Sequence, residues 1–176
     1  MPAAVPTVLV TGSSKGIGFA TALAFARAGY QVAATMRDPV RAPELARAAA
    51  AEQLPIRVSA MDVDDDASVA TGVARIIAEL GAIDVLVNNA GIERTGSVEE
   101  LSLADVRAVM ETNYFGAIRC IQAVLPAMRQ RRGGCIGSRS SNPASSTRPW
   151  RTASPPRSRR RRIPTSAATP ACLRRC

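Results

Sequence analysis

A glycine-rich turn between an apolar run and a helical pattern constrains this chain more than any other feature. The run Val8–Val10 is rich in β-branched residues, the turn carries Gly12, Gly16 and Gly18, and apolar residues then recur at helical spacing from Ile17. A strand, a glycine-rich turn and a helix in this order suit a phosphate, because the backbone can approach it and the helix N-terminus offers free N–H groups. A tight turn without any ligand uses glycine in the same way, so the motif alone leaves both interpretations open.

Strand-like and helix-like segments alternate four times along the chain. We expect strands at 6–11, 30–36, 56–61 and 84–88, and helices at 17–28, 41–53, 66–80 and 103–131. The last helix is either one long helix or two joined ones, and Pro126 inside it is a candidate kink. Residues 132–136 resemble the start of a fifth strand. The alternation predicts an α/β fold: an incomplete, Rossmann-like, doubly wound parallel sheet of about four to five strands.

Candidate ligand contacts gather at one edge of this expected sheet. Ligands of doubly wound sheets bind beyond the carboxyl ends of the strands. The glycine-rich turn, Arg37, Asp62 and the run 89–91 all follow directly after expected strands. Four candidate contacts at one edge favour a nucleotide site over a plain turn.

Four motifs in order and spacing extend this pattern: 11–18, Asp62-Val63, 88–91 and Asn113. Together they resemble the short-chain dehydrogenase/reductases over about residues 5–137. The resemblance implies an oxidoreductase that transfers hydride between NAD(P) and a carbonyl or alcohol. It also implies a cofactor-binding set, consisting of Gly12, Ser13, Ser14, Lys15, Gly16, Ile17, Gly18, Arg37, Asp62, Val63, Asn89, Ala90 and Gly91.

The same resemblance implies a role for each motif. Ser13, Lys15 and Ile17 lie along the cofactor phosphates and ribose. Asp62 hydrogen-bonds the adenine, with Val63 beside it. The run 89–91 passes under the ribose and nicotinamide, and Asn113 orders a water near the catalytic Lys of the family.

The charge at the end of the second expected strand bears on the choice of cofactor. An NAD site needs a carboxylate there for the ribose hydroxyls. The segment 34–37 contains no acid, while Lys15 and Arg37 bring two cations near one spot. Two cations suit a 2′-phosphate, so we favour NADP. Two alternatives stay open: Arg37 is a solvated charge at a strand end, or Asp38 points inward and restores NAD.

The catalytic Ser, Tyr and Lys of the family cannot be identified in the chain. The resemblance implies a Ser near 138–141, followed by Tyr-x-x-x-Lys, in which Tyr moves a proton and Lys lowers its pKa. Tyr30 and Tyr114 are the two tyrosines, both upstream, and Lys15 is the single lysine. Asn113 is thus the one identifiable catalytic position, and we expect no turnover by the chain as it stands.

The chain changes character after residue 137. Residues 1–128 hold 10 basic and 14 acidic side chains, a net charge of −4, whereas 129–176 hold 13 arginines and no acid. We therefore expect a dinucleotide-binding domain at 1–137 and a disordered or out-of-frame Arg/Pro/Ser-rich tail at 138–176. Three explanations of the tail remain. The preferred one is a frameshift in GC-rich DNA, which agrees with 22 arginines against one lysine. The others are a genuine nucleic-acid-binding tail around 159–162 and an inert solvated tail.

Composition excludes several other classes. The chain has no His, and its four cysteines lack metal-ligand spacing, so we expect no metal site. The sequence has no apolar run long enough for a membrane span and no secretory signal, which predicts a cytoplasmic protein. A small carbonyl or alcohol is the expected substrate of the parent enzyme, and nucleic acid is not the expected partner. Family members are commonly homo-oligomers, but here we expect marginal stability and aggregation, because later strands and helices of the fold are missing.

Overall fold

The computed structural model describes residues 5–131 and 133–138. Five parallel strands form one sheet in the order β3-β2-β1-β4-β5. The strands are β1 (Thr7–Thr11), β2 (Gln31–Met36), β3 (Ile56–Ala60), β4 (Val85–Asn88) and β5 (Cys135–Ser138). The helical segments are α1 (Gly16–Arg27), α2 (Glu44–Ala51), α3 (Asp66–Leu80), α4 (Leu103–Met110), η1 (Glu111–Phe115) and α5 (Gly116–Gln130). The expected α/β class and Rossmann-like parallel sheet are confirmed.

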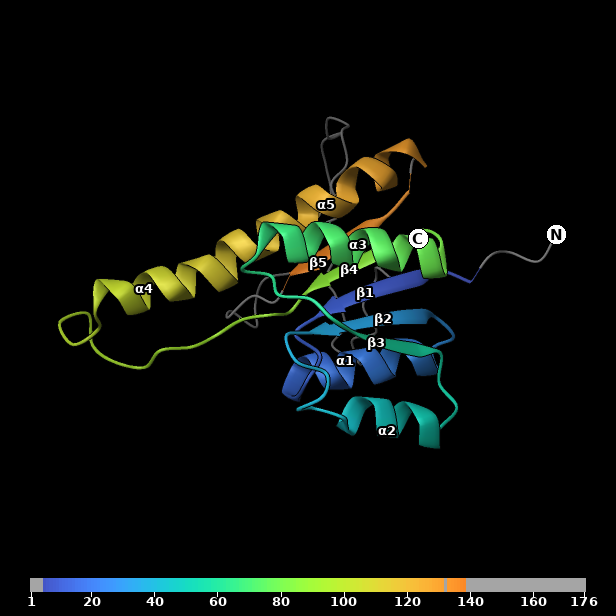
Figure 1. Cartoon of the computed structure of the whole chain (residues 1–176), viewed down its shortest axis with the longest axis horizontal. Helices are drawn as coiled ribbons and strands as arrows, with labels where there is room; N and C mark the ends of the chain where they lie inside the picture. Colours follow the sequence, from blue (N-terminus) through green and yellow to red (C-terminus); the bar gives the residue numbers. More distant parts are fainter. Residues whose placement is uncertain (1–4, 132, 139–176) are drawn as a thin grey trace, which may run out of the picture.

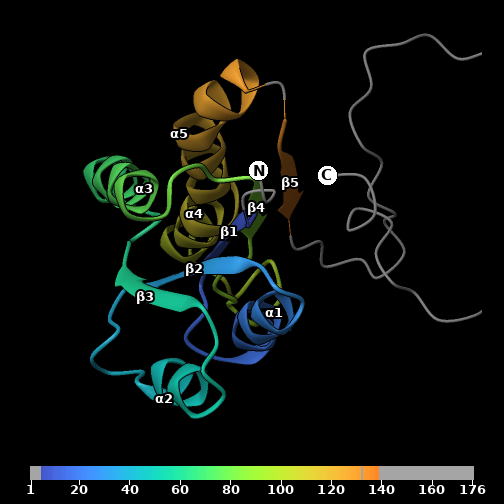
Figure 2. The same cartoon turned by 90° about the vertical axis from the view of Figure 1, so that its right-hand side faces the viewer.

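The central strand β1 has both faces covered. Val8 and Val10 belong to one cluster of buried residues and Leu9 to another, because successive side chains of a strand point to opposite faces. Helices α1 and α2 cover the first face, and α3 and α5 cover the second (Figure 2). This two-sided burial explains why the middle of β1, Val8–Val10, is apolar throughout rather than alternating.

The helical run 103–130 differs from the expectation in where it is irregular. Helix α5 continues through Pro126 to Gln130, and the irregular part is the π-helical segment η1. Figure 1 shows α4, η1 and α5 following one another as a long rod whose α4 end extends beyond the sheet. None of the residues of α4 is buried. By contrast, α5 packs on α3 and β4, and this packing fixes the α5 end of the rod.

The end of the described chain is close to the expected domain boundary. Strand β5 pairs with β4 and ends at Ser138, one residue beyond the expected end of the domain. The expected Arg-rich tail, including 159–162, otherwise lies outside the described residues. Within the described residues, no helix has both the length and the apolar character that crossing a bilayer requires.

Candidate nucleotide-binding site

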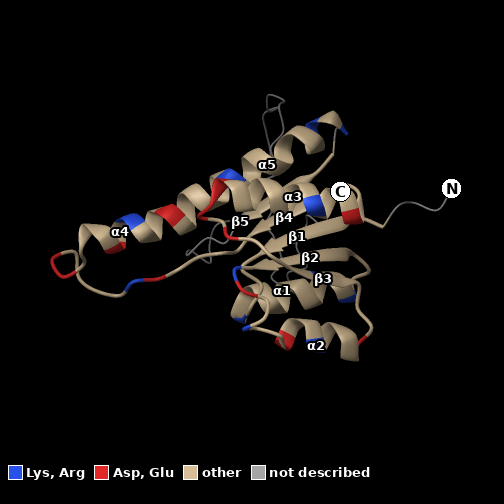
Figure 3. Ribbon diagram, viewed as in Figure 1, with Lys and Arg blue, Asp and Glu red and all other residues tan. Residues whose placement is uncertain are grey.

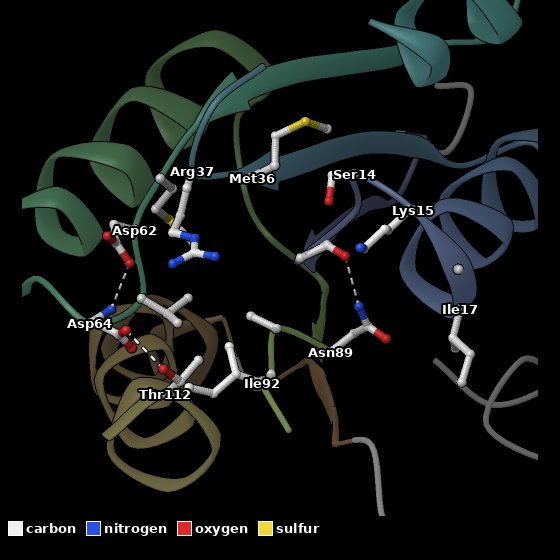
Figure 4. Close-up of a pocket in the computed structure, with 16 residues that line it drawn as sticks. Ser14, Lys15, Ile17, Met36, Arg37, Asp62, Asp64, Asn89, Ile92 and Thr112 are labelled. Atoms are coloured by element: carbon white, nitrogen blue, oxygen red, sulfur yellow. Dashed lines mark hydrogen bonds between the residues drawn. The ribbon is translucent and has the colours of Figure 1, made fainter. Parts of the chain in front are cut away.

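A cavity of about 370 Å³ lies beyond the carboxyl ends of β1, β2, β3 and β4 (Figure 4). Its lining comes from five segments that are far apart in the sequence. The lining residues are Gly12, Ser14, Lys15, Gly16, Ile17, Met36, Arg37, Met61, Asp62, Val63, Asp64, Asn89, Ala90, Gly91, Ile92 and Thr112. Eleven expected cofactor-binding residues thus lie together around one cavity, although whether they bind a cofactor remains a prediction. Ser13, Gly18 and Asn113 are not part of the lining.

Gly12 allows the turn after β1 to lie against the segment after β4. It adopts a φ of +66°, and a Cβ built on it would lie 2.6 Å from the Cα of Ala90. Gly18, in the first turn of α1, also allows a close approach, because a Cβ there would collide with the Gly12 carbonyl and the Asn89 amide. These two glycines serve close backbone packing within the protein, and this packing shapes the cavity.

Ser13 serves the fold rather than the cavity wall. Its side chain is completely buried, and its hydroxyl donates to the Val10 carbonyl at 2.9 Å. Its backbone N–H donates to the Thr35 carbonyl at 3.0 Å. The hydroxyl thus closes the turn, and Ser14 is the serine that reaches the cavity.

The cavity has two cationic side chains, Lys15 and Arg37, on its lining. Both are exposed, and within the described residues neither forms an ion pair. Figure 4 shows the Arg37 guanidinium extending into the hollow. The lining also carries the carboxylates Asp62 and Asp64, so the two cations offer local positive charge to an anion without making the whole cavity basic.

The neighbouring acid, Asp38, is occupied by its own turn. Its Oδ1 accepts from the backbone N–H groups of Val40 at 3.0 Å and Arg41 at 3.2 Å, and its Oδ2 lies 3.2 Å from Nε of Arg41. Asp38 is absent from the cavity lining. The carboxylate next to Arg37 therefore stabilises the loop after β2 and does not reach the cavity lining.

The wall after β3 is built from the turn that begins at Asp62. The Oδ1 of Asp62 accepts from the Asp64 N–H at 3.1 Å. The backbone N–H of Asp62 donates to the Ser68 Oγ at 2.9 Å. Val63 is buried in the core and also lines the cavity. The turn is thus rigidly tied to the start of α3.

The wall after β4 is fixed through Thr11. Its buried Oγ1 accepts from the N–H groups of Asn89 and Ala90, each at 3.0 Å. The Asn89 amide donates to the carbonyls of Thr11 at 3.0 Å and Gly12 at 2.9 Å. The other polar side-chain atom, Oδ1 of Asn89, is buried without a hydrogen-bond partner in the described residues. The amide of Asn89 therefore serves mainly to hold the segment after β4 against the turn after β1.

Asn113 lies behind the wall and holds it. Its Oδ1 accepts from the Ile92 N–H at 2.8 Å and its Nδ2 donates to the Ile92 carbonyl at 2.9 Å. The side chain thereby ties η1 to the segment after β4. The water-ordering role implied for Asn113 is not tested by this geometry and stays a prediction.

Several lining residues were not expected from the sequence. These are Met36, Met61, Asp64, Ile92 and Thr112. The two methionines are the last residues of the expected strands 30–36 and 56–61, so strand ends alone could have indicated them. Thr112 comes from a helix far along the chain, and no local pattern marks it.

Neither tyrosine of the described chain lines the cavity. Tyr30 packs edge-to-face on Phe25 with centroids 5.3 Å apart, and Tyr114 packs on Phe115 at 5.2 Å. No group of three or more potential metal ligands occurs in the described ranges. The glycine-rich backbone and the two cations of the lining fit a phosphate-bearing nucleotide, and binding of one stays a prediction.

Comparison with known proteins supports this geometry. The short chain dehydrogenase family profile matches residues 6–153. Retinol dehydrogenase 8 of Homo sapiens is 47% identical over 141 residues, which is 77% of this chain and 44% of that protein. The 2,3-dihydro-2,3-dihydroxybenzoate dehydrogenase of Escherichia coli (strain K12) is 40% identical over 80% of this chain and 53% of that protein.

A solved structure agrees as well. The gluconate 5-dehydrogenase from Burkholderia cenocepacia J2315, in complex with NADP and tartrate, superposes with a TM-score of 0.70 at 34% identity, covering 76% of this chain and 52% of that one. The chain spans about half the length of the relatives that it matches. Because the family profile covers most of the sequence and a relative is 47% identical over 77% of it, this chain belongs to the short-chain dehydrogenase/reductase family.

Proposed function

We propose that the chain binds NADP(H) in the cavity described above, as the cofactor-binding part of an oxidoreductase that interconverts a carbonyl and an alcohol. The expected cofactor-binding residues carry this proposal. Among them, Ser13 and Gly18 act as supports of the turn. The cofactor supplies hydride chemistry when bound. The residues of the chain hold and orient it, with Asn89 fixing the segment after β4 that forms one wall.

The observation that carries the preference for NADP is the pairing of Asp38. An NAD site uses a carboxylate near the end of β2, but Asp38 bonds to Val40 and Arg41 and is absent from the cavity lining. Arg37 and Lys15 remain as cations on the rim. A 2′-phosphate satisfies these cations, whereas a ribose hydroxyl leaves them without a charged partner.

A titration of the full chain with NADPH and NADH, followed by nicotinamide fluorescence, tests this proposal. We expect NADPH to bind about tenfold or more tightly than NADH, and Arg37→Met to remove most of that difference, in keeping with one charge-assisted contact. Arg47→Met on α2 is the matched control, because Arg47 is exposed and absent from the cavity lining. Tighter binding of NADH than of NADPH contradicts the choice of cofactor, and binding of neither contradicts the site itself.

We infer further that the chain as it stands does not turn over. Its one lysine lies in the glycine-rich turn and its tyrosines lie outside the cavity lining, so no Tyr-x-x-x-Lys pair can move the proton. This absence supports the frameshift hypothesis for 138–176. Translating the coding DNA across 129–176 in the other two frames tests that hypothesis: a Tyr-x-x-x-Lys in one frame supports it, and its absence from both contradicts it.

The remaining expectations follow from the family. A small carbonyl or alcohol is the proposed substrate of the parent enzyme, and the 47% identity with retinol dehydrogenase 8 favours a retinol-type compound. We propose a cytoplasmic location. Nucleic acid is not favoured, because Figure 3 shows Lys and Arg positions alternating with Asp and Glu positions along the ribbon of the described residues.

A further inference from the structure

The turn at 62–66 contacts the long helical run as well as its own strand and helix. Residues Asp62, Val63 and Asp64 of this turn line the cavity. The contacts within the turn and to Ser68 fix its start relative to α3. These contacts do not involve the Val63 carbonyl or the Asp64 carboxylate, which bond to another part of the chain.

That support comes from one face of η1 and α5. The hydroxyl of Thr112, 7% exposed, donates to Oδ2 of Asp64 at 2.8 Å. One turn later, Gly116 lies so close that a Cβ would come within 2.8 Å of Cγ2 of Val63 and 3.2 Å of its carbonyl oxygen. A further turn on, Arg119 donates to the Val63 carbonyl at 3.3 Å.

Arg119 also fixes the far end of the turn. Its guanidinium pairs with Asp66, the first residue of α3, and with Glu111 of η1. Thr112, Gly116 and Arg119 follow one another at spacings of four and three residues, which places them on a single helical face. We call these three residues the helix clamp. Figure 4 shows its first member, Thr112, reaching Asp64 at the cavity wall.

We propose that the helix clamp of Thr112, Gly116 and Arg119 is a positioning device for the adenosine end of the cavity, acting through the Asp62–Asp64 wall. The inference rests on the proposed NADP site, because Arg37 beside this wall is the proposed 2′-phosphate contact. The clamp residues do not replace Asp62 or Arg37 as ligand contacts. They hold the wall at a fixed distance from β2, so that its acceptors and N–H groups are preorganised.

The test uses the full chain and two half-cofactors, 2′,5′-ADP and reduced nicotinamide mononucleotide. Thr112→Val removes the hydroxyl donor at nearly constant volume, and we expect it to weaken 2′,5′-ADP binding about tenfold while leaving the nicotinamide half unchanged. Thr112→Ser keeps the donor and is expected to restore binding. Thr71→Val, at an exposed position of α3, is the matched control. A merely structural defect would weaken both half-cofactors together.

Amide hydrogen exchange of residues 62–66 provides a readout that needs no ligand. We expect faster exchange there in Thr112→Val and in Arg119→Met than in wild type, with Arg107→Met on α4 as the exposed arginine control. If Thr112→Val does not fold, Arg119→Met carries both measurements. Equal 2′,5′-ADP affinity in the clamp variants and wild type overturns the inference. If the wild type binds neither half-cofactor, the proposed function fails. The helix clamp is then judged from hydrogen exchange alone, and unchanged exchange in the variants overturns it.

Discussion

Two glycines of the turn after β1 share a left-handed backbone but have different surroundings. Gly12 and Gly16 have φ of +66° and +61°. A Cβ on Gly12 would meet the Ala90 backbone at 2.6 Å, whereas one on Gly16 would meet nothing within 4 Å. Gly16→Ala should therefore cost only the conformational strain, about 1 kcal/mol of unfolding free energy. Gly12→Ala should cost about 1–3 kcal/mol more, because the backbone after β4 must shift. Urea denaturation of the two variants measures the difference, and equal losses would show that the close approach contributes nothing.

Cys120 of α5 gives stability a pH dependence at alkaline pH. The side chain is completely buried, and this burial raises the pKa of its thiol from 9.0 to about 11. The folded state therefore keeps the proton to higher pH than the unfolded state does. The contribution is fully present below pH 9 and is lost as the pH rises toward 11, amounting to about 2 kcal/mol.

The measurement is the unfolding free energy of wild type and Cys120→Ala between pH 8 and pH 11. Wild type should lose more stability over this interval than the variant, whose side chain does not titrate. Parallel pH profiles would contradict the buried, protonated thiol.

At the level of elements, two helices have similar N-caps but different tertiary support. Asp65 caps α3 by accepting from the Ser68 N–H at 2.6 Å, and Ser102 caps α4 by accepting from the Asp105 N–H at 3.1 Å. Helix α3 buries four residues against the core, whereas α4 buries none. Asp65→Ala should therefore lower the global unfolding free energy by about 1 kcal/mol. Ser102→Ala should mainly increase local fraying of α4.

Urea denaturation combined with amide exchange distinguishes the two effects. We expect a lower urea midpoint for Asp65→Ala alone, and faster exchange confined to α4 for Ser102→Ala. An equal drop in the midpoint for both variants would mean that α4 is part of the cooperative core.

At the scale of the whole molecule, an apolar face remains exposed along the helical rod. Its members recur at spacings of three and four residues: Leu103, Val106, Met110, Tyr114 and Ile118, with exposed fractions from 36% to 70%. A contiguous apolar surface of this kind promotes association. We expect the chain to self-associate and to have marginal solubility. The double variant Val106→Lys, Met110→Lys should shift its sedimentation toward the monomer.

The matched control for that face is Val40→Lys with Val98→Lys. Both valines are almost fully exposed, at 88% and 94%, but lie in separate loops rather than on the apolar face. This control should leave sedimentation unchanged. A monomeric wild-type chain, or an equal effect of both double variants, would contradict the prediction.

Most elements of the fold could be predicted from local patterns. The strand β1 and the helix α3 fall within a residue of their expected positions, because apolar runs and helical periodicity are local properties. Helix α2 is shorter than expected at its start, since the Asp38 turn and Pro43 precede it. Pro126 did not mark the irregularity in the rod, which lies at η1 instead. There the side chains of Thr112 and Asn113 bond to segments after β3 and β4, and no local pattern indicates such distant partners.

The sequence by itself determined the α/β class, the sheet edge that carries the cavity, and most of the cavity's lining. It could do so because the motifs directly follow the strands, whose carboxyl ends meet in a parallel sheet. Only the tertiary structure decided which groups are free to meet a ligand. It turned the Ser13 hydroxyl into the fold, engaged Asp38 with Arg41, left Arg37 facing the cavity, and brought Thr112 to the wall. The physical reason is that the availability of a polar group depends on its hydrogen-bond partners, and these partners come from segments far apart along the chain.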